Sequence, residues 1–576
     1  MVGFLLVGGP ASLAAATRQA GFVEVEKGRL WYESRGSGPA LVLIHDGLLP
    51  SETWDAQVEP FAPHFRVVRY DRRRYGRSTS ETDDFSNVAD LRALLDHLKI
   101  PTATLIGCSS GGGLAIDFTL AEKDRVGALV LVGPVVSGFG YSGHFIERGA
   151  RNRAPVYRAQ DKDAAVLNWA NDRYITDARN AEARTRLREL LRRFPFSAAG
   201  GDPGGRPEPP ALARLPEIRV PTLLITGESD IPDVHAHIGA IASRLSWAER
   251  QLVPVAGHLP HLERPDEFND RVLDFLAPTG HVAEILTRLR RDPPDLAAFD
   301  YDPRAPLDAQ EKGIERRGQV LVRDLSYASP RGGRAPAFLI AREDERDAPA
   351  LLFLHHGQGN RRTFLDEAVE LAEAGFVSLL IDAPGYRGEP EGLYFDAGRE
   401  RAEIEQTVID LRRGFDLLVT RPEVDATRLG YVGYSLGATM GARLLGVEPR
   451  VRASVMVAGF AALTLDLSRG DRRAAVSVRA LLPPDKRPAY LEALAALDGV
   501  RYLDRRARAP LLVQLARSDA FVSRLDGALF AAAAGEPMVT TWYDGGHFEL
   551  GQGPARDERR AFLLRTLATR SSAQGR

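Results

Sequence analysis

The sequence has little cysteine, no excess of charge and no long apolar run. Its single cysteine, Cys108, cannot form an intramolecular disulfide, and no CxxC or Cys/His cluster could hold a structural zinc. Lys and Arg number 75 against 77 Asp and Glu, so no global field concentrates nucleic acid or an anionic membrane. The basic runs 72–74 and 290–291 lie beside acidic residues and are interpreted as solvated surface. We therefore expect no nucleic-acid partner.

No apolar run reaches the roughly 18 residues that a membrane-spanning helix needs. The first sixteen residues resemble the apolar region of a signal peptide, but no Lys or Arg precedes that region. Residues 1–20 are interpreted as an N-terminal tail. A reducing, cytoplasmic location is expected, with secretion as the less favoured alternative.

The length of 576 residues exceeds what one hydrophobic core supports, because cores stop growing near roughly 250 to 300 residues. Short, almost wholly apolar runs alternate with stretches such as 88–98, in which apolar residues recur at helical spacing. This alternation predicts an α/β fold, a mostly parallel sheet with helices on both faces. The strands expected in the first half are 40–44, 65–70, 102–106, 128–132 and 222–226.

The same alternation begins again near Gly318, which predicts an internal duplication of the fold. The strands expected in the second copy are 350–354, 377–381, 429–432 and 510–515. We expect a first domain over 21–278 and a second over 318–570. The linker between them, 279–317, is punctuated by prolines, and we expect one helix in it around 282–290.

Each copy has an insertion between two of its core strands. In the first copy residues 137–215 contain helical runs and the Gly/Pro-rich stretch 198–210, which predicts a helical cap over the carboxyl edge of the sheet. In the second copy the shorter segment 461–503 occupies the same place.

A GxSxG pattern occurs once in each predicted domain, as GCSSG (107–111) and GYSLG (433–437). Each follows an apolar strand and precedes a helical run, which is the context of a nucleophile elbow. The glycines permit the sharp turn that exposes the serine oxygen at the start of the next helix. One match in a chain with 54 glycines is equally explained by a Gly-rich turn, but one match at each such junction indicates Ser109 and Ser435 as nucleophiles.

A serine hydroxyl becomes nucleophilic when a histidine takes its proton and an acid orients that histidine. In the order Ser, Asp, His that accompanies this elbow, the candidates are Asp230 with His258 and Asp519 with His547. Both histidines follow their acids by the same 28 residues, which two unrelated pairs would seldom share.

Neighbouring polar residues offer alternatives in the first copy. Asp233 is the local alternative for the acid and His261 for the base. The pair His355–His356 has no carboxylate or third histidine spaced to complete a metal site, and Cys108 is interpreted as a small buried residue. No metal and no cofactor are expected.

The tetrahedral intermediate also needs hydrogen-bond donors for its oxyanion. One backbone amide in each copy belongs to the residue after the nucleophile, Ser110 or Leu436. The other is expected just after the third strand, from Gly47 or Leu48 in the first copy and from Gln358 in the second.

The first domain resembles the α/β-hydrolase fold-1 family over about 21–276. The resemblance rests on Trp54 and on LIHDG (43–47), YDRRRYGRS (70–78), GCSSGGG (107–113), GESD (227–230) and GHLPHLERPDEF (257–268). These motifs are specific for the fold and not for a substrate. Asp46 and Arg74 depart from the family, since both stand where a glycine is usual, and the first departure leaves open whether Gly47 or Leu48 is the oxyanion donor.

The second domain resembles the dienelactone hydrolase and prolyl-oligopeptidase-like branch over about 318–567. The motifs are LHHGQG (354–359), DAPGYRG (382–388), VDATRLGYVGYSLGA (424–438), ARSD (516–519) and YDGGHFE (543–549). Dienelactone hydrolases use a cysteine nucleophile, whereas Ser435 indicates the esterase-like members. The sequence has no β-propeller before this domain, which argues against an oligopeptidase.

These observations predict two consecutive α/β-hydrolase domains, each a serine hydrolase of carboxylic esters or related acyl compounds. The reaction would pass through an acyl-enzyme and use a separate Ser-His-Asp set in each domain. Dehalogenases and epoxide hydrolases of this fold have an aspartate at the elbow, so the serines argue against both. The alternatives are acyl transfer or C–C bond hydrolysis by the same residues, or a non-catalytic binding role for one domain.

Overall fold

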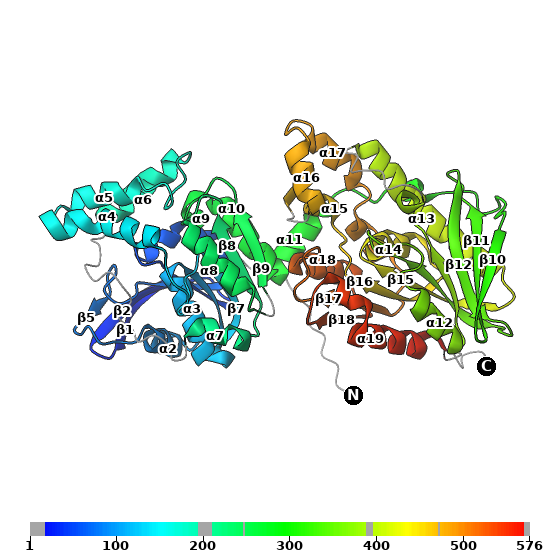
Figure 1. Cartoon of the computed structure of the whole chain (residues 1–576), viewed down its shortest axis with the longest axis horizontal. Helices are drawn as coiled ribbons and strands as arrows, with labels where there is room; N and C mark the ends of the chain where they lie inside the picture. Colours follow the sequence, from blue (N-terminus) through cyan, green and yellow to red (C-terminus); the bar gives the residue numbers. More distant parts are fainter. Residues whose placement is uncertain (1–17, 194–209, 246–247, 388–395, 470–472, 569–576) are drawn as a thin grey trace. The chain divides into compact units, whose positions relative to one another are not determined.

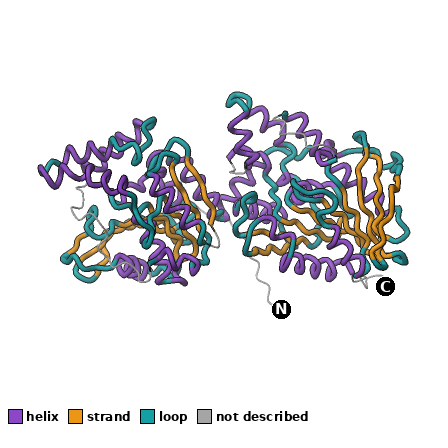
Figure 2. Tube along the Cα trace, in the orientation of Figure 1, coloured by secondary structure: helices purple, strands orange, loops and turns teal. Residues whose placement is uncertain are grey.

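The computed structural model describes residues 18–193, 210–245, 248–387, 396–469 and 473–568. The chain forms two compact units, residues 1–278 (unit 1) and 279–576 (unit 2). Each has its own sheet with helices on both faces, as the strands and helices of Figure 2 show. The Gly/Pro-rich stretch 198–210 and the N-terminal tail lie almost wholly outside the described residues.

The described part of unit 1 contains a nine-stranded sheet of order β1-β2-β4-β3-β6-β7-β8-β9, with β5 paired to β2. Every pairing from β4 to β9 along this order is parallel, and the pairings of β2 are antiparallel. The strands are β1 (Gln19–Val25), β2 (Gly28–Arg35), β3 (Ala40–Ile44), β4 (Arg66–Tyr70), β5 (Thr79–Ser80), β6 (Ala103–Cys108), β7 (Val126–Val132), β8 (Thr222–Gly227) and β9 (Ala248–Val253). All five strands expected in the first copy are therefore present.

Helices cover both faces of this sheet (Figure 1). They are α1 (Asp55–Phe61), α2 (Asn87–His97), α3 (Ser110–Ala121), α4 (Gly143–Ala159), α5 (Lys162–Ala170), α6 (Ala181–Arg193), α7 (Ala211–Arg214), α8 (Pro232–Ala242), α9 (Pro260–Glu263) and α10 (Pro265–Leu276). Between β7 and β8, α4, α5 and α6 pack side by side, where the sequence predicts a helical cap.

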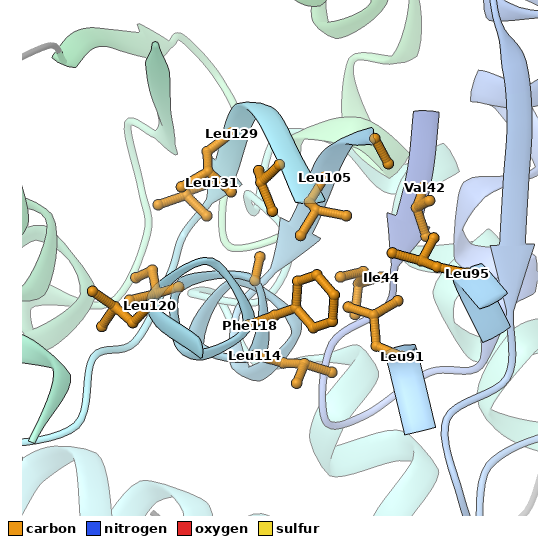
Figure 3. Packing of buried hydrophobic residues seen from close by; sticks show 14 of the residues in the cluster. Val42, Ile44, Leu91, Leu95, Leu105, Leu114, Phe118, Leu120, Leu129 and Leu131 are labelled. Atoms are coloured by element: carbon orange, nitrogen blue, oxygen red, sulfur yellow. The ribbon is translucent and has the colours of Figure 1, made fainter. Parts of the chain in front are cut away.

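Successive residues of the central strands enter two different cores, because side chains alternate across a strand. Val42 and Ile44 of β3 pack with α2 and α3 on one face, whereas Leu41 and Leu43 enter the core on the opposite face. Figure 3 shows the first core, where Phe118 of α3 lies among leucines from the strands and from α2. Burial on both faces explains why these strands are almost wholly apolar in sequence.

The described part of unit 2 also contains a nine-stranded sheet, of order β10-β11-β12-β14-β13-β15-β16-β17-β18. The pairings from β10 to β14 are antiparallel and the others are parallel. The strands are β10 (Gln310–Arg317), β11 (Val320–Ala328), β12 (Arg334–Arg342), β13 (Ala348–Leu354), β14 (Val377–Ile381), β15 (Val424–Tyr434), β16 (Val451–Val457), β17 (Leu511–Ala516) and β18 (Met538–Tyr543).

The helices of unit 2 begin within the segment expected as a linker, where α11 and then β10 lie. They are α11 (Thr279–Leu289), α12 (Leu365–Glu373), α13 (Ala397–Val419), α14 (Leu436–Val447), α15 (Leu463–Arg469), α16 (Arg473–Leu481), α17 (Arg487–Ala495), α18 (Arg524–Ala534) and α19 (Gly553–Leu563). Helices α15 to α17 lie between β16 and β17, in the segment 461–503 that corresponds to the cap. Within the described ranges, no helix combines the length and apolar character of a membrane span.

Candidate active site

Ser109 and Ser435 occupy the same backbone position in the two units. Each lies between a strand and a helix, β6 and α3 for Ser109 and β15 and α14 for Ser435. Their dihedral angles are φ 53°, ψ −116° and φ 52°, ψ −103°. A positive φ is uncommon for a residue with a Cβ, and such strain persists where the surrounding structure enforces it. Both serines are partly exposed.

The flanking glycines are required by close backbone contacts. A Cβ at Gly107 would lie 2.4 Å from the Gly111 carbonyl oxygen, and one at Gly111 would lie 2.4 Å from the His45 carbonyl oxygen. In unit 2 a Cβ at Gly433 would lie 2.4 Å from Gly437, and one at Gly437 would lie 2.1 Å from the Leu354 oxygen. The turn that bends the chain at each serine thus excludes any side chain at these glycines.

The structure brings together the acid and the histidine that the sequence assigns to unit 1. His258 Nδ1 lies 2.9 Å from Asp230 Oδ1, and that oxygen also accepts the backbone N–H of Ile231 at 2.6 Å. The turn after β8 therefore fixes the carboxylate. Burial opposes protonation of His258, but the charge and hydrogen bond of Asp230, together with the charge of Asp46, raise its pKa above the usual 6.5.

The corresponding pair of unit 2 has the same arrangement. His547 Nδ1 lies 2.8 Å from Asp519 Oδ2 and 3.0 Å from Oδ1. Asp519 Oδ1 also accepts the backbone N–H groups of Phe521 at 2.7 Å and Val522 at 3.0 Å. The Tyr434 hydroxyl donates to the His547 carbonyl oxygen at 2.5 Å and so ties the histidine loop to the residue before Ser435.

Backbone contacts connect each serine with the strand that follows its helix. The Ser109 N–H donates to Val132 at 2.8 Å, and that of Ser435 donates to Val457 at 2.7 Å. The next residue in unit 1 is Gly133, and a Cβ there would lie 3.0 Å from both Asp230 Oδ2 and His258 Nδ1. Gly133 was not among the residues predicted from the sequence, although its place directly after the strand 128–132 marks it as a residue of the carboxyl edge.

A neutral histidine anchors the loop after β3 in unit 1 and the loop after β13 in unit 2. The N–H of Arg72 donates to His45 Nε2 at 2.9 Å, so the imidazole proton lies on Nδ1, which donates to the Asp46 carbonyl at 2.7 Å. In unit 2, Ala383 N–H donates to His355 Nε2 at 3.1 Å, and His355 Nδ1 donates to the His356 carbonyl at 2.7 Å. Burial lowers the pKa of His45 to about 3, with a smaller effect of Arg72, and burial lowers that of His355 too.

Two of the five backbone amides expected to bind the oxyanion donate to other acceptors in the structure. The N–H of Leu48 donates to Asp46 Oδ1, which also accepts Leu49 at 2.9 Å. The N–H of Gln358 donates to His356 Nδ1 at 3.2 Å. The amides of Ser110 and Leu436 begin helices, where the first N–H groups have no intrahelical acceptor.

Exposed glycines stand two residues after each anchoring histidine, Gly47 after His45 and Gly357 after His355. A tyrosine lies beside each of them. Tyr75 donates to the Gly47 carbonyl at 3.2 Å, and the Tyr386 hydroxyl lies 3.3 Å from where a Gly357 Cβ would be. Gly357 was not among the residues expected from the sequence. It corresponds to Gly47 only because His355, and not His356, is the histidine that anchors the loop.

In unit 1 a charged side chain contacts the residue after the nucleophile, at a place where unit 2 has apolar residues. Arg72 is buried and donates through Nη1 to Ser110 Oγ at 2.8 Å. The residues at these two positions of unit 2 are Ala383 and Leu436, which are apolar. Arg74, which departs from the family glycine, has φ 71° and so adopts the conformation that glycine favours.

Asp233 and His261, the alternative acid and base of unit 1, make other contacts. Asp233 accepts the N–H of Ser142 at 2.6 Å and its hydroxyl at 2.8 Å, at the start of α4. His261 is fully buried, lies 2.8 Å from the Thr53 hydroxyl and stacks on Trp54 at 4.1 Å. Burial, with a smaller effect of His258, lowers the pKa of His261 to about 3.

The first domain is similar to known proteins over nearly its whole length. A family model described as the alpha/beta hydrolase family matches residues 41–271. A putative 2-succinyl-6-hydroxy-2,4-cyclohexadiene-1-carboxylate synthase of Bacillus subtilis is 29% identical over 259 residues, which cover 42% of this chain and 92% of that protein. A 2-hydroxy-6-oxononadienedioate/2-hydroxy-6-oxononatrienedioate hydrolase of Paraburkholderia xenovorans is 30% identical over 280 residues, 44% of this chain and 94% of that protein.

Among solved structures, one described as Est816, an N-acyl homoserine lactone degrading enzyme, is 27% identical. The match covers 44% of this chain and all of that one, with a TM-score of 0.38.

Proposed function

Because this chain belongs to the alpha/beta hydrolase family through residues 41–271, we propose that it is a serine hydrolase with one catalytic centre in each unit. The substrates are carboxylic esters or related small acyl compounds. The observation that carries the proposal is the repeated arrangement of a buried Asp–His pair with a serine in a strained turn. Unit 2 enters the proposal on this geometry and on its resemblance to esterase-like dienelactone hydrolase relatives.

In the proposed mechanism Ser109 or Ser435 attacks the acyl carbon while His258 or His547 accepts the hydroxyl proton. Asp230 and Asp519 hold the proton on Nδ1, so that Nε2 is the free base, and they stabilise the imidazolium that forms. The histidine then gives the proton to the leaving group. Water attacks the acyl-enzyme by the same route in reverse.

For the oxyanion we assign the amides of Ser110 and Leu436 and, as second donors, those of Gly47 and Gly357. The hydrogen bonds of Leu48 and Gln358 to neighbouring side chains support the glycines over these two residues. Losing one such donor typically costs about 10² to 10³ in rate.

A fluorophosphonate probe on the Ser109→Ala and Ser435→Ala chains tests the proposal. Each single variant is expected to bind one equivalent of probe, and the double variant none. A unit whose serine stays unlabelled, while its thermal unfolding is normal, is a binding module and not a hydrolase. Adding an acceptor alcohol during ester turnover separates hydrolysis from acyl transfer, because a transferase forms the new ester at the expense of free acid.

A second candidate for unit 1 is hydrolysis of an oxo-dienedioate, since relatives named for that activity are 27–30% identical over nearly their whole length. Turnover of 2-hydroxy-6-oxononadienedioate by the Ser435→Ala chain, absent from the double serine variant, would favour this candidate. Turnover of simple esters alone would favour the first.

A further inference from the structure

Aromatic rings surround the His547 imidazole in unit 2. The ring of Phe521 lies 4.7 Å from that of His547, Phe548 lies at 5.2 Å and Tyr434 at 5.6 Å, measured between centroids. His356 joins this group, 5.4 Å from Phe548 and 5.2 Å from Tyr434. We call these four residues, Tyr434, Phe521, Phe548 and His356, the aromatic cluster.

The cluster is open to solvent at its edge. Phe548 is 48% exposed, and Phe521 and His356 are partly exposed. Keeping a phenylalanine half exposed forgoes much of the roughly 1.5 to 3 kcal/mol that full burial of such a side chain contributes. A half-exposed ring directly after the proposed catalytic histidine is therefore available to a bound molecule.

The fold does not require aromatic residues at these places. Counting from the same landmarks in unit 1, the matching residues are Cys108 before the nucleophile, Pro232 after the acid, Leu259 after the histidine and Asp46 after His45. None of them is aromatic, although both units have a hydrogen-bonded Asp–His pair. The cluster thus distinguishes the second site from the first.

The position of the rings indicates which part of a substrate they meet. His547 must give its proton to the leaving-group oxygen, so that oxygen lies within hydrogen-bond reach of the imidazole. Rings centred about 5 Å from the imidazole are therefore within reach of the leaving group. Aromatic rings prefer partners that stack or meet edge to face at such distances.

His356 adds a polar element to the cluster. The Gln358 N–H donates to His356 Nδ1, so the neutral imidazole carries its proton on Nε2 and presents it as a donor. Burial, with smaller effects of His355 and His547, lowers the pKa of His356 to about 4 and keeps it neutral at neutral pH. An acceptor substituent on a bound ring can take this hydrogen bond.

We propose that the second site is selective for esters whose leaving group is an alcohol that carries a planar aromatic ring, recognised by Phe521, Phe548 and His356. This inference rests on the proposed hydrolase function of unit 2. It assigns unit 2 a substrate class that unit 1, with Pro232, Leu259 and Asp46 at the matching places, does not share.

The test compares benzyl acetate with cyclohexylmethyl acetate in the Ser109→Ala chain, which leaves only the second site. Both leaving groups are primary alcohols of similar size, so the planar ring is the main difference. We expect a kcat/KM ratio favouring the benzyl ester by about fivefold or more. Phe521→Leu and Phe548→Leu each lower the ratio by about two- to tenfold, since leucine keeps an apolar side chain but has no ring face.

The Ser435→Ala chain is the matched control, because unit 1 lacks the aromatic cluster and is expected to show a ratio close to one. Equal hydrolysis of the two esters by the Ser109→Ala chain, or a ratio that the Phe521→Leu/Phe548→Leu double change leaves intact, overturns the inference while the hydrolase function stands. Failure of Ser435 to react with a fluorophosphonate and with either ester overturns both.

Discussion

Asp46 and His356 occupy the same position in the two units, and each accepts the backbone N–H of the second residue after it. Asp46 Oδ1 accepts Leu48, and His356 Nδ1 accepts Gln358. The same turn is therefore closed by a carboxylate in one unit and by a neutral imidazole in the other. The carboxylate also acts on His258, whose pKa it helps to raise.

Replacing Asp46 with Asn should move the acidic limb of the unit 1 pH profile to lower pH. His258 must be neutral to accept the serine proton, so kcat/KM rises as pH rises through its pKa. The negative charge of Asp46 stabilises the imidazolium, and removing that charge lowers the pKa. The measurement is kcat/KM against pH, from about 5 to 8, in the Ser435→Ala chain.

Asparagine keeps an Oδ1 acceptor for Leu48 and Leu49, so the turn is preserved. Asp163→Asn removes a carboxylate of the same unit whose side chain is 85% exposed, and it should leave the limb in place. A limb that stays fixed in Asp46→Asn, or moves to higher pH, contradicts this prediction.

Asp230→Asn and Asp519→Asn should each abolish most activity of their own unit and leave the other unit unchanged. An amide in place of the carboxylate favours the wrong histidine tautomer, which in triads of this kind lowers kcat about 10⁴-fold. The assay is ester turnover in the chain whose other serine is alanine. Asp233→Asn is the matched control, since Asp233 contacts Ser142 and not His258; a loss as large as that of Asp230→Asn would reverse the assignment of the acid.

Gly133→Ala should lower kcat of unit 1 by up to about tenfold, because a displacement of catalytic groups by about 1 Å can cost about 10²-fold and a smaller one costs less. The added Cβ would lie 3.0 Å from Asp230 Oδ2 and from His258 Nδ1, so the pair must give by a few tenths of an ångström. Residue 458 of unit 2 has a similar φ, 49° against 48° at Gly133. The opposite change, Ala458→Gly, removes a methyl group without crowding anything and should keep kcat close to that of the parent chain; equal effects of the two changes would exclude crowding as the cause.

Glu367→Ala should destabilise unit 2 by about 3 to 5 kcal/mol, the usual cost of leaving one member of a buried ion pair uncompensated. The Arg559 guanidinium is 1% exposed and lies 2.6 Å from the Glu367 carboxylate. It also donates to the carbonyls of Leu550 at 2.7 Å and Gly551 at 3.0 Å, at the end of the short 3-10 helix η8 (His547–Gly551).

Urea unfolding of unit 2 can be followed through loss of Ser435-dependent ester turnover in the Ser109→Ala chain. Glu370→Ala breaks the neighbouring pair with Arg556, in which Glu370 is 42% exposed, and should cost less than about 1 kcal/mol. Comparable costs for the two variants would show that burial of the Arg559 pair is not the source of its effect.

The central strands were predictable from the sequence because they are buried on both faces. Strands β3 and β14 have the bounds that their apolar runs indicate. Strand β10 fell within the expected linker instead, since its residues QEKGIERR are almost all exposed and show no apolar pattern. An antiparallel edge strand of this kind is held by backbone pairing, which leaves little trace in the sequence.

Part of the candidate site was likewise predictable from the sequence, and part of it was not. Chain order and equal spacing predict the pairs Asp230–His258 and Asp519–His547, which the structure brings within hydrogen-bond distance. The acceptors of the Leu48 and Gln358 amides depend on how two neighbouring side chains turn. The aromatic cluster brings the last residue of β15 together with segments that follow β13, β17 and β18, and no local sequence pattern predicts that these residues meet.

The duplication also sets a stoichiometry. Since both sheets belong to one polypeptide, translation produces the two proposed centres in equal number. Gene expression cannot change the ratio between them. Substitutions around the individual elbows, such as those at Asp46 or Phe548, are the means by which the balance between them can change.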